Sequence, residues 1–345
     1  MRLRRPLLAV AAVSASMSLA AAAGAGCSAE PRGDGGESAT SSVISPEDEA
    51  ADGSTLAEPR RVCPSNRNPD GSWVVVDGID ISDYKYTDWD EVVRRNPNQK
   101  YAFARVSAGL VRLDSRFFID WPAMKRVGLI RGAYQYFKPS QSAVAQADLF
   151  LRRMQEEGGL EPEDFPPVFD LETTNDMPIP TVLCRARIWL ARVERATKRL
   201  PLIYTSAQHN AILPAELRRY PLWVANYVAT PSRTCPRMPD AWPKWDLWQW
   251  SESATVSGVY TNANRDDDAG GSIAMLDGGG GPAPSGVDVN YYDGTLADLK
   301  RFIASATSTG DVPDPPPLAN PPVVHGAGPV GSPIDCDDGC CRAAP

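Results

Sequence analysis

The chain alternates short apolar runs with helix-like segments, and this alternation is the feature that most limits its fold. Eight runs have the length and composition of strands, and helices clearly separate the first five of them. The last three strand candidates have little helix between them. Such alternation favours a mostly parallel sheet. We therefore expect an α/β fold, an irregular (β/α) TIM-like barrel of roughly five β/α units followed by three strands with little helix.

The expected elements follow one another along the middle of the chain. The strand candidates are residues 74–82, 101–107, 129–137, 167–172, 201–206, 221–227, 246–251 and 286–292. The helix candidates are residues 87–95, 115–127, 141–157 and 181–198, each with apolar residues on one face.

The two ends of the chain differ in composition from its middle. Residues 1–27 join a basic start to a short run of small and apolar residues, which predicts a secretory signal peptide. The sequence before Cys27, Gly-Ala-Gly, resembles a bacterial lipobox, so either lipidation of Cys27 or simple cleavage among the nearby alanines is expected. Residues 28–64 are predicted to form a flexible tether, and residues 306–345 a disordered tail rich in Pro and Gly.

The globular part is then residues 65–305, interrupted by a predicted loop insertion at 261–285. The insertion carries three consecutive aspartates, Asp266, Asp267 and Asp268, whose spacing does not match a calcium-binding loop. We expect a solvated surface loop there and no metal site.

Export implies an oxidising compartment in which disulfides form. Cys63 and Cys235 both precede proline and flank the core, so we expect them to form a bridge. Cys184 lies in a helical pattern and is predicted to be a buried free thiol. The remaining cysteines, at positions 336, 340 and 341, are expected to pair within the tail. Spacing alone does not fix these connections.

Composition excludes several kinds of chemistry. The chain has 35 basic and 43 acidic residues and a net charge of −8, which argues against a nucleic-acid partner. It has two histidines, His209 and His325, which leaves almost no material for a Ser-His-Asp triad or a multi-histidine metal site. Carboxylates are therefore the main catalytic groups available, and we expect no cofactor.

Residues 165–172, FPPVFDLE, end an apolar run in two carboxylates, Asp170 and Glu172. If the strand runs through both, they share one face and stand about 7 Å apart, given a rise of about 3.3 Å per residue. Asp80 and Asp288 lie near the ends of the first and last strands, which are neighbours in a closed barrel. Converging acids repel one another, so at least one should have a raised pKa and act as a proton donor. Paired carboxylates are typical of enzymes that cleave glycosidic bonds.

Aromatic residues occur at the same strand ends, where they suit the apolar faces of sugar rings. As a group, five of them are predicted to bind substrate: Tyr134, Tyr136, Tyr204, Trp223 and Tyr227.

In this order, the segments GIDIS, YAFARVS, RGAYQYF, PPVFDLE, PLIYTS, PLWVANY, DLWQWS and VDVNYYDG resemble glycoside hydrolase family 25, the Chalaropsis-type lysozymes or N-acetylmuramidases. The resemblance covers about residues 76–303. It implies an irregular barrel that hydrolyses the β-1,4 bond between N-acetylmuramic acid and N-acetylglucosamine. It matches Glu172 to the general acid, Asp170 to the other carboxylate of that motif, and Asp80 and Asp288 to the acids of the outer strands.

Two features depart from the family pattern. Gln135 stands where many members carry His, which predicts altered substrate contacts at that position. The insertion at 261–285 is longer than expected and lies just before Asp288, where it would cover the groove or narrow substrate choice.

The sequence therefore predicts an exported peptidoglycan hydrolase, either secreted or lipid-anchored in the bacterial cell envelope, with Glu172 as general acid. Its expected partners are peptidoglycan glycan strands, with membrane contact only through a lipid anchor, and the protein is expected to be a monomer. The alternatives are a non-catalytic glycan-binding barrel and a glycosidase acting on another N-acetylated polymer such as chitin.

Overall fold

The structure, a computed structural model, describes residues 60–261, 284–308, 323–324, 340 and 342–343. The predicted signal peptide, Cys27, and most of the tether, the insertion and the tail lie outside the described residues. Among the described residues, no helix is long and apolar enough to cross a membrane.

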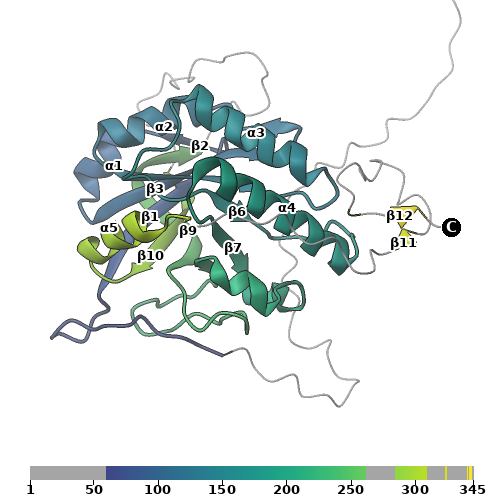
Figure 1. The fold of residues 1–345 in the computed structure, drawn as a ribbon. Coiled ribbons are helices and arrows are strands. Elements are labelled where there is room, and N and C mark those ends of the chain that lie inside the picture. The colour runs from purple at the N-terminus through teal and green to yellow at the C-terminus, as the bar shows by residue number, and fades with distance from the viewer. Residues whose placement is uncertain (1–59, 262–283, 309–322, 325–339, 341, 344–345) are drawn as a thin grey trace, which may run out of the picture. The chain divides into compact units, whose positions relative to one another are not determined.

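Eight of the described strands close into a barrel, as the sequence predicts (Figure 1). In barrel order they are β1 (Val75–Ile81), β3 (Gln99–Ala108), β5 (Ile130–Tyr136), β6 (Val168–Asp170), β7 (Leu202–Ser206), β8 (Leu222–Ala225), β9 (Leu247–Thr261) and β10 (Pro284–Asp293). Pairing of β1 with β3 on one side and with β10 on the other closes the ring.

The last strand runs against its neighbours. Strands β1 to β9 of the barrel pair in parallel, whereas β10 is antiparallel to both β9 and β1. The absence of a predicted helix before the eighth strand accounts for this, because a parallel connection needs a crossover while an antiparallel one needs only a hairpin. β9 is also longer than predicted and extends beyond the barrel, where β2 (Lys85–Thr87) pairs with it.

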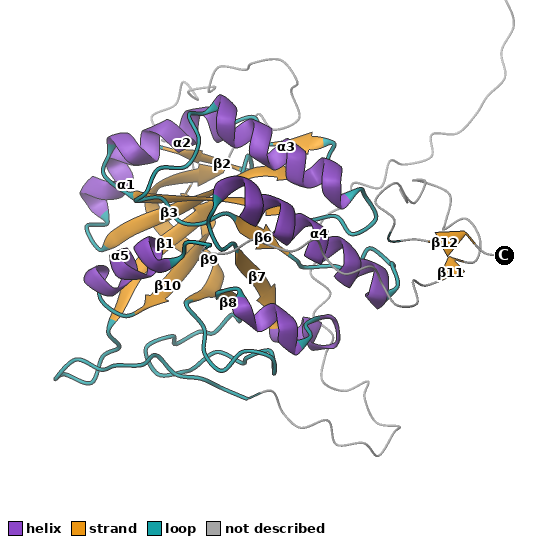
Figure 2. Cartoon of the chain, viewed as in Figure 1, coloured by secondary structure: helices purple, strands orange, loops and turns teal. Residues whose placement is uncertain are grey.

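Helices cover the outside of the barrel (Figure 2). They are α1 (Trp89–Arg95), α2 (Phe117–Arg126), α3 (Ala143–Glu156), α4 (Ile179–Thr197) and α5 (Leu296–Ser305), with short 3₁₀ helices η1 (Ala207–Ile212) and η2 (Ala215–Arg219) after β7. The first four lie within three residues of their predicted limits. Side-chain caps explain several starts, since Asp88, Ser142 and Thr295 each accept a hydrogen bond from a backbone N–H of the first turn. The remaining short strands are β4 (Arg112–Leu113), β11 (Val323–Val324) and β12 (Arg342–Ala343).

The barrel interior is filled by aromatic side chains and is closed at its base by α5. The rings of Phe103 and Trp223 lie 4.5 Å apart inside the barrel, and Leu299 and Ile303 of α5 pack into the same cluster. Gly132 makes room for this packing, because a Cβ there would lie 2.2 Å from the ring of Phe103. With the base filled, the cleft among the described residues lies at the opposite end of the barrel.

Two disulfides join distant parts of the chain. Cys63 is bonded to Cys235, as the sequence predicts, and ties the segment before β1 to the loop before β9. The prediction of a free thiol at Cys184 was wrong, because Cys184 is bonded to Cys340. Cys184 is only half-buried on α4, so a tail cysteine reaches it. Cys336 and Cys341 lie outside the described residues.

Candidate active site

The open end of the barrel holds a cleft with a volume of about 220 Å³. Its lining residues are Asp80, Ser82, Arg105, Tyr134, Tyr136, Asp170, Glu172, Tyr204, Trp223, Tyr227, Gln249, Glu252 and Asp288. All four predicted carboxylates and all five predicted aromatic residues are among them, because alternate residues of each strand point into the barrel. The structure thus brings together the whole predicted set, and the roles of its members remain predictions.

Asp170 and Glu172 form a carboxyl pair at the end of β6. β6 ends at Asp170, so the expectation of one strand that runs through both residues, with a spacing of about 7 Å, was wrong. The two side chains lie within hydrogen-bonding reach of each other. Burial raises the pKa of Asp170 well above its usual range, and the neighbouring charge of Glu172 adds to this. Burial also raises the pKa of Glu172. The pair therefore retains a proton under conditions in which isolated carboxyls have lost theirs.

The two members of this pair differ in their access to solvent. Asp170 is buried, and its Oδ1 has no hydrogen-bond partner within the described part of the chain. Glu172 is crowded by the walls of the cleft, yet its side chain remains open to solvent. Of the two, Glu172 is the carboxyl that a ligand in the cleft can touch.

Asp80 and Asp288 form the second carboxyl pair and are cross-strand neighbours in β1 and β10. The sequence suggested that Asp288 lies near a strand end. Because β10 is antiparallel to its neighbours, Asp288 instead reaches the cleft from the middle of the strand. Burial raises the pKa of Asp80 to about 6, although Asn290 and Gln249 donate hydrogen bonds of 2.7 and 2.9 Å to its Oδ2. Burial, followed by the charge of Asp80, raises the pKa of Asp288 well above its usual range.

The five aromatic residues are placed in two ways. Tyr134 is half-buried and its hydroxyl donates to Ile81 O at 3.3 Å, at the wall of the cleft. Trp223 is 1% exposed and donates from Nε1 to Asn290, so it supports the floor of the cleft. Tyr204 is buried and donates to Gln249 Oε1 at 2.6 Å. Tyr136 is half-buried and Tyr227 is 47% exposed, so these two rings present surface on which a sugar can stack.

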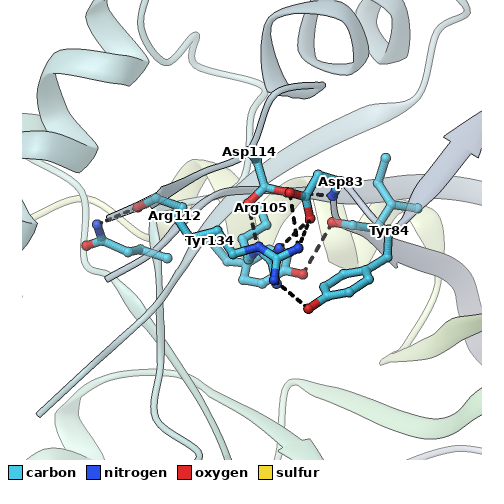
Figure 3. A network of polar contacts seen from close by, with 9 residues as sticks. Asp83, Tyr84, Arg105, Arg112, Asp114 and Tyr134 are labelled. Atoms are coloured by element: carbon cyan, nitrogen blue, oxygen red, sulfur yellow. Dashed lines mark hydrogen bonds and ion pairs between the residues drawn. The ribbon is translucent and has the colours of Figure 1, made fainter. Parts of the chain in front are cut away.

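Sequence reasoning missed Arg105, a buried cation that lines the cleft. Its Nε donates to Asp114 Oδ2 at 2.6 Å and its Nη2 to Asp83 Oδ1 at 2.7 Å, as Figure 3 shows. Arg112 joins the network through Asp83 and Tyr84. An arginine inside the apolar strand YAFARVS was the signal for it, because a charge in a buried strand needs partners.

Gln249 and His209 were also missed. Gln249 lies at the centre of the cleft, since it donates to Asp80 and accepts from the hydroxyls of Tyr204 and Tyr227. His209 follows β7 and hydrogen-bonds to the backbone of Glu172, while its Nδ1 lies 3.2 Å from Ser206 Oγ. Gln249 positions the Asp80 carboxylate and lies in the segment DLWQWS, whereas His209 positions the backbone of Glu172 and lies in none of the segments that carry the resemblance.

Comparison with protein families identifies the chain. Residues 79–259 match the model of glycosyl hydrolases family 25. The chain belongs to this family. As a member of this family, the chain is a glycoside hydrolase, and its fold and cleft agree with that assignment.

Known proteins and a solved structure are similar to the chain. The chain is 31% identical over 240 residues to the uncharacterized protein YegX of Escherichia coli K12. The aligned region covers 68% of this chain and 75% of YegX. It is 27% identical over 215 residues to lysozyme M1 of Streptomyces globisporus, covering 58% of this chain and 70% of the relative. The crystal structure of a bacterial lysozyme from Streptomyces coelicolor superposes with a TM-score of 0.54 at 24% identity, over 67% of this chain and 98% of that one.

Gln135, where many family members carry His, does not face the cleft. It is fully buried on the outer side of β5, where it donates to Ser107 Oγ at 2.9 Å and accepts from Trp189 Nε1 at 2.6 Å. The expectation of altered substrate contacts there was wrong, because the alternation of β5 points Gln135 at α4 while Tyr134 and Tyr136 line the cleft.

The described residues contain no group of three or more His, Cys, Asp or Glu side chains that could hold a metal ion. The aspartates at positions 266–268 lie outside them.

Proposed function

We propose that this family 25 enzyme is a muramidase that cleaves the β-1,4 bond between N-acetylmuramic acid and N-acetylglucosamine in peptidoglycan. The observation that carries the proposal is the convergence of two carboxyl pairs on an open cleft beside exposed aromatic rings. A relative of the chain is named as a lysozyme, and lysozymes act on peptidoglycan.

Glu172 is the proposed general acid. Hydrolysis of a glycosidic bond requires a proton on the leaving oxygen, and the carboxyl that supplies it needs a raised pKa and contact with the ligand. Glu172 meets both conditions, because burial raises its pKa and its side chain is open to the cleft. Asp170, which hydrogen-bonds to Glu172, keeps a proton within the pair.

The other three carboxyls stabilise the positive charge that develops on the sugar ring in an oxocarbenium-like transition state. Asp80 is held by Gln249 and Asn290 in one orientation, which avoids reorganisation during the reaction. Asp170 is buried, so it acts on the substrate through Glu172 and not by direct contact.

The test is digestion of purified peptidoglycan followed by borohydride reduction and mass spectrometry of the new ends. We expect reduced muramic acid ends with the wild-type protein and none with Glu172→Gln. Glu163→Gln is the matched control, since Glu163 is exposed in the loop before β6. Reduced glucosamine ends would contradict the bond assignment. Faster cleavage of chitin would identify another N-acetylated polymer as substrate, and binding without cleavage would indicate a glycan-binding barrel.

The proposed substrate lies outside the cytoplasm, so we propose that the protein is exported and acts on the cell envelope as a monomer. Processing of the full chain that is blocked by globomycin would establish lipidation at Cys27. Globomycin-insensitive release into the medium would establish simple cleavage instead. A single monomeric species in light scattering is the expected oligomeric state.

A further inference from the structure

Lys138 lies at the rim of the cleft, just beyond the end of β5. Buried Gln146 of α3 binds its backbone on both sides, because Gln146 Oε1 accepts from Lys138 N at 3.0 Å and Gln146 Nε2 donates to Lys138 O at 3.0 Å. Gly109 leaves room for the side-chain stem, since a Cβ at residue 109 would lie 2.8 Å from Lys138 Cγ. The ammonium group lies 4.5 Å from the ring centroid of Tyr136, which lines the cleft. The backbone of Lys138 is thus anchored to α3, and its ammonium group lies against a ring that lines the cleft.

The charge of Lys138 is less compensated than that of the neighbouring arginines. Arg105 is paired with Asp83 and Asp114, and Arg112 with Asp83. Within the described part of the chain, Lys138 forms no ion pair within 4 Å, and Glu172 and Asp170 act on it only as more distant charges. A half-buried ammonium group in this state is available for an anionic ligand.

The charges of the cleft are arranged asymmetrically. Lys138 follows β5, and Glu252 belongs to β9, which is the strand diametrically opposite β5 in the barrel order. Asp288 of β10 lies beside Glu252 and feels its charge. Lys85 also acts on Asp288, but its ammonium group donates a hydrogen bond to Gly286 O, and the charges of Asp80 and Asp288 offset its own. A substrate carboxylate would be repelled by the floor and by the β9–β10 side, so the Lys138 side is where negative charge on a substrate can lie.

We propose that Lys138 binds a carboxylate on the side branch of the muramic acid unit and so makes the enzyme selective for acidic glycan over neutral N-acetylated glycan. This inference rests on the proposed muramidase function. Of the two alternating sugars, only muramic acid carries a lactyl ether with a carboxyl group, from which acidic peptide stems also extend. Both sources present a carboxylate that leaves the glycan at the rim of a cleft, where Lys138 lies, and not at its floor.

The experiment measures binding, so that its result does not depend on hydrolysis. The probes are glycan strands with free lactyl carboxylates, the same strands with these groups converted to methylamides, and strands that still carry acidic peptide stems. Each is titrated by calorimetry into Glu172→Gln and into Glu172→Gln combined with Lys138→Met. Lys138→Arg keeps the charge, and Lys300→Met, an exposed lysine of α5 at the closed base, is the matched control for net charge.

We expect Glu172→Gln to bind carboxylate strands about tenfold more tightly than methylamide strands at low salt. Lys138→Met should remove this preference, whereas Lys138→Arg and Lys300→Met should keep it. A preference that appears only for stem-bearing strands would support carboxylate recognition and assign it to the peptide. Equal binding of all three probes, or equal weakening of all three by Lys138→Met, would overturn the proposal. If the wild-type protein cleaves peptidoglycan but Glu172→Gln shows no preference for carboxylate strands, only the role of Lys138 is refuted. If the preference is present but the wild-type protein does not cleave peptidoglycan, only the muramidase function is refuted.

Discussion

Replacing Asp80 by Asn is expected to stabilise the protein at neutral pH while abolishing most hydrolysis. Asp80 is 4% exposed, and burial raises its pKa from the usual 3.8 to about 6. Because a tenfold change in proton affinity corresponds to about 1.4 kcal/mol, the charged form of Asp80 costs the folded state roughly 3 kcal/mol. An Asn side chain occupies the same space and still accepts hydrogen bonds from Gln249 and Asn290, but it carries no charge.

The gain in stability from Asp80→Asn should increase with pH, because the wild-type protein loses the proton on Asp80 as the pH rises. Between pH 3.8 and about 6 the folded protein retains a proton on Asp80 that the unfolded chain has released. The stability that this proton contributes is fully present below pH 3.8 and is lost as the pH rises through about 6. The Asp80→Asn variant has no such loss. The two proteins should therefore be equally stable near pH 4, and above about pH 7 the variant should be more stable by about 3 kcal/mol.

Urea denaturation at several pH values between 4 and 8 measures this difference. For a domain of this size, ~3 kcal/mol corresponds to a rise in Tm of roughly 6–12 °C. Glu163→Gln, which changes an exposed carboxylate outside the cleft, should show no comparable pH-dependent difference. A variant that is less stable than the wild type at pH 7.5, or a difference that does not change with pH, would refute the reasoning. Either result would mean that Gln249 and Asn290 stabilise the charged form of Asp80 more than burial destabilises it.

Three further results are expected. The value of kcat/KM should fall on the alkaline side as the Asp170–Glu172 pair loses its proton, because burial raises both pKa values; a rate that keeps rising to pH 9 would exclude the pair as proton donor. Gln249→Leu should lower kcat/KM by about 10- to 100-fold with the fold retained by circular dichroism, because charge-assisted hydrogen bonds are lost; unchanged kinetics would argue against its positioning role. Peptide mapping without reduction should recover Cys184 linked to Cys340, and alkylation of Cys184 in the native protein would contradict that link.

Much of the barrel could be predicted from local patterns. Each strand candidate combined apolar residues with turn signals, and each long helix had one apolar face, so their positions followed from short-range sequence. The ends of the strands were harder to predict, because pairing with neighbouring strands decides where a strand stops. β9 extends to Thr261 because β2 and β10 pair with it, and β6 ends at Asp170 although the apolar pattern continues.

The sequence by itself determined which residue types line the cleft, because strand alternation and strand order place Asp80, Asp170 and Glu172 on the inner side of one end. Only the tertiary structure decided how these groups interact. The reversal of β10 sets Asp288 beside Asp80, and the end of β6 at Asp170 lets Glu172 approach Asp170. The pKa of each carboxyl depends on burial and on charges that are far away in sequence, such as Asp80 acting on Asp288. Those distances exist only once the chain has folded, and no local pattern encodes them.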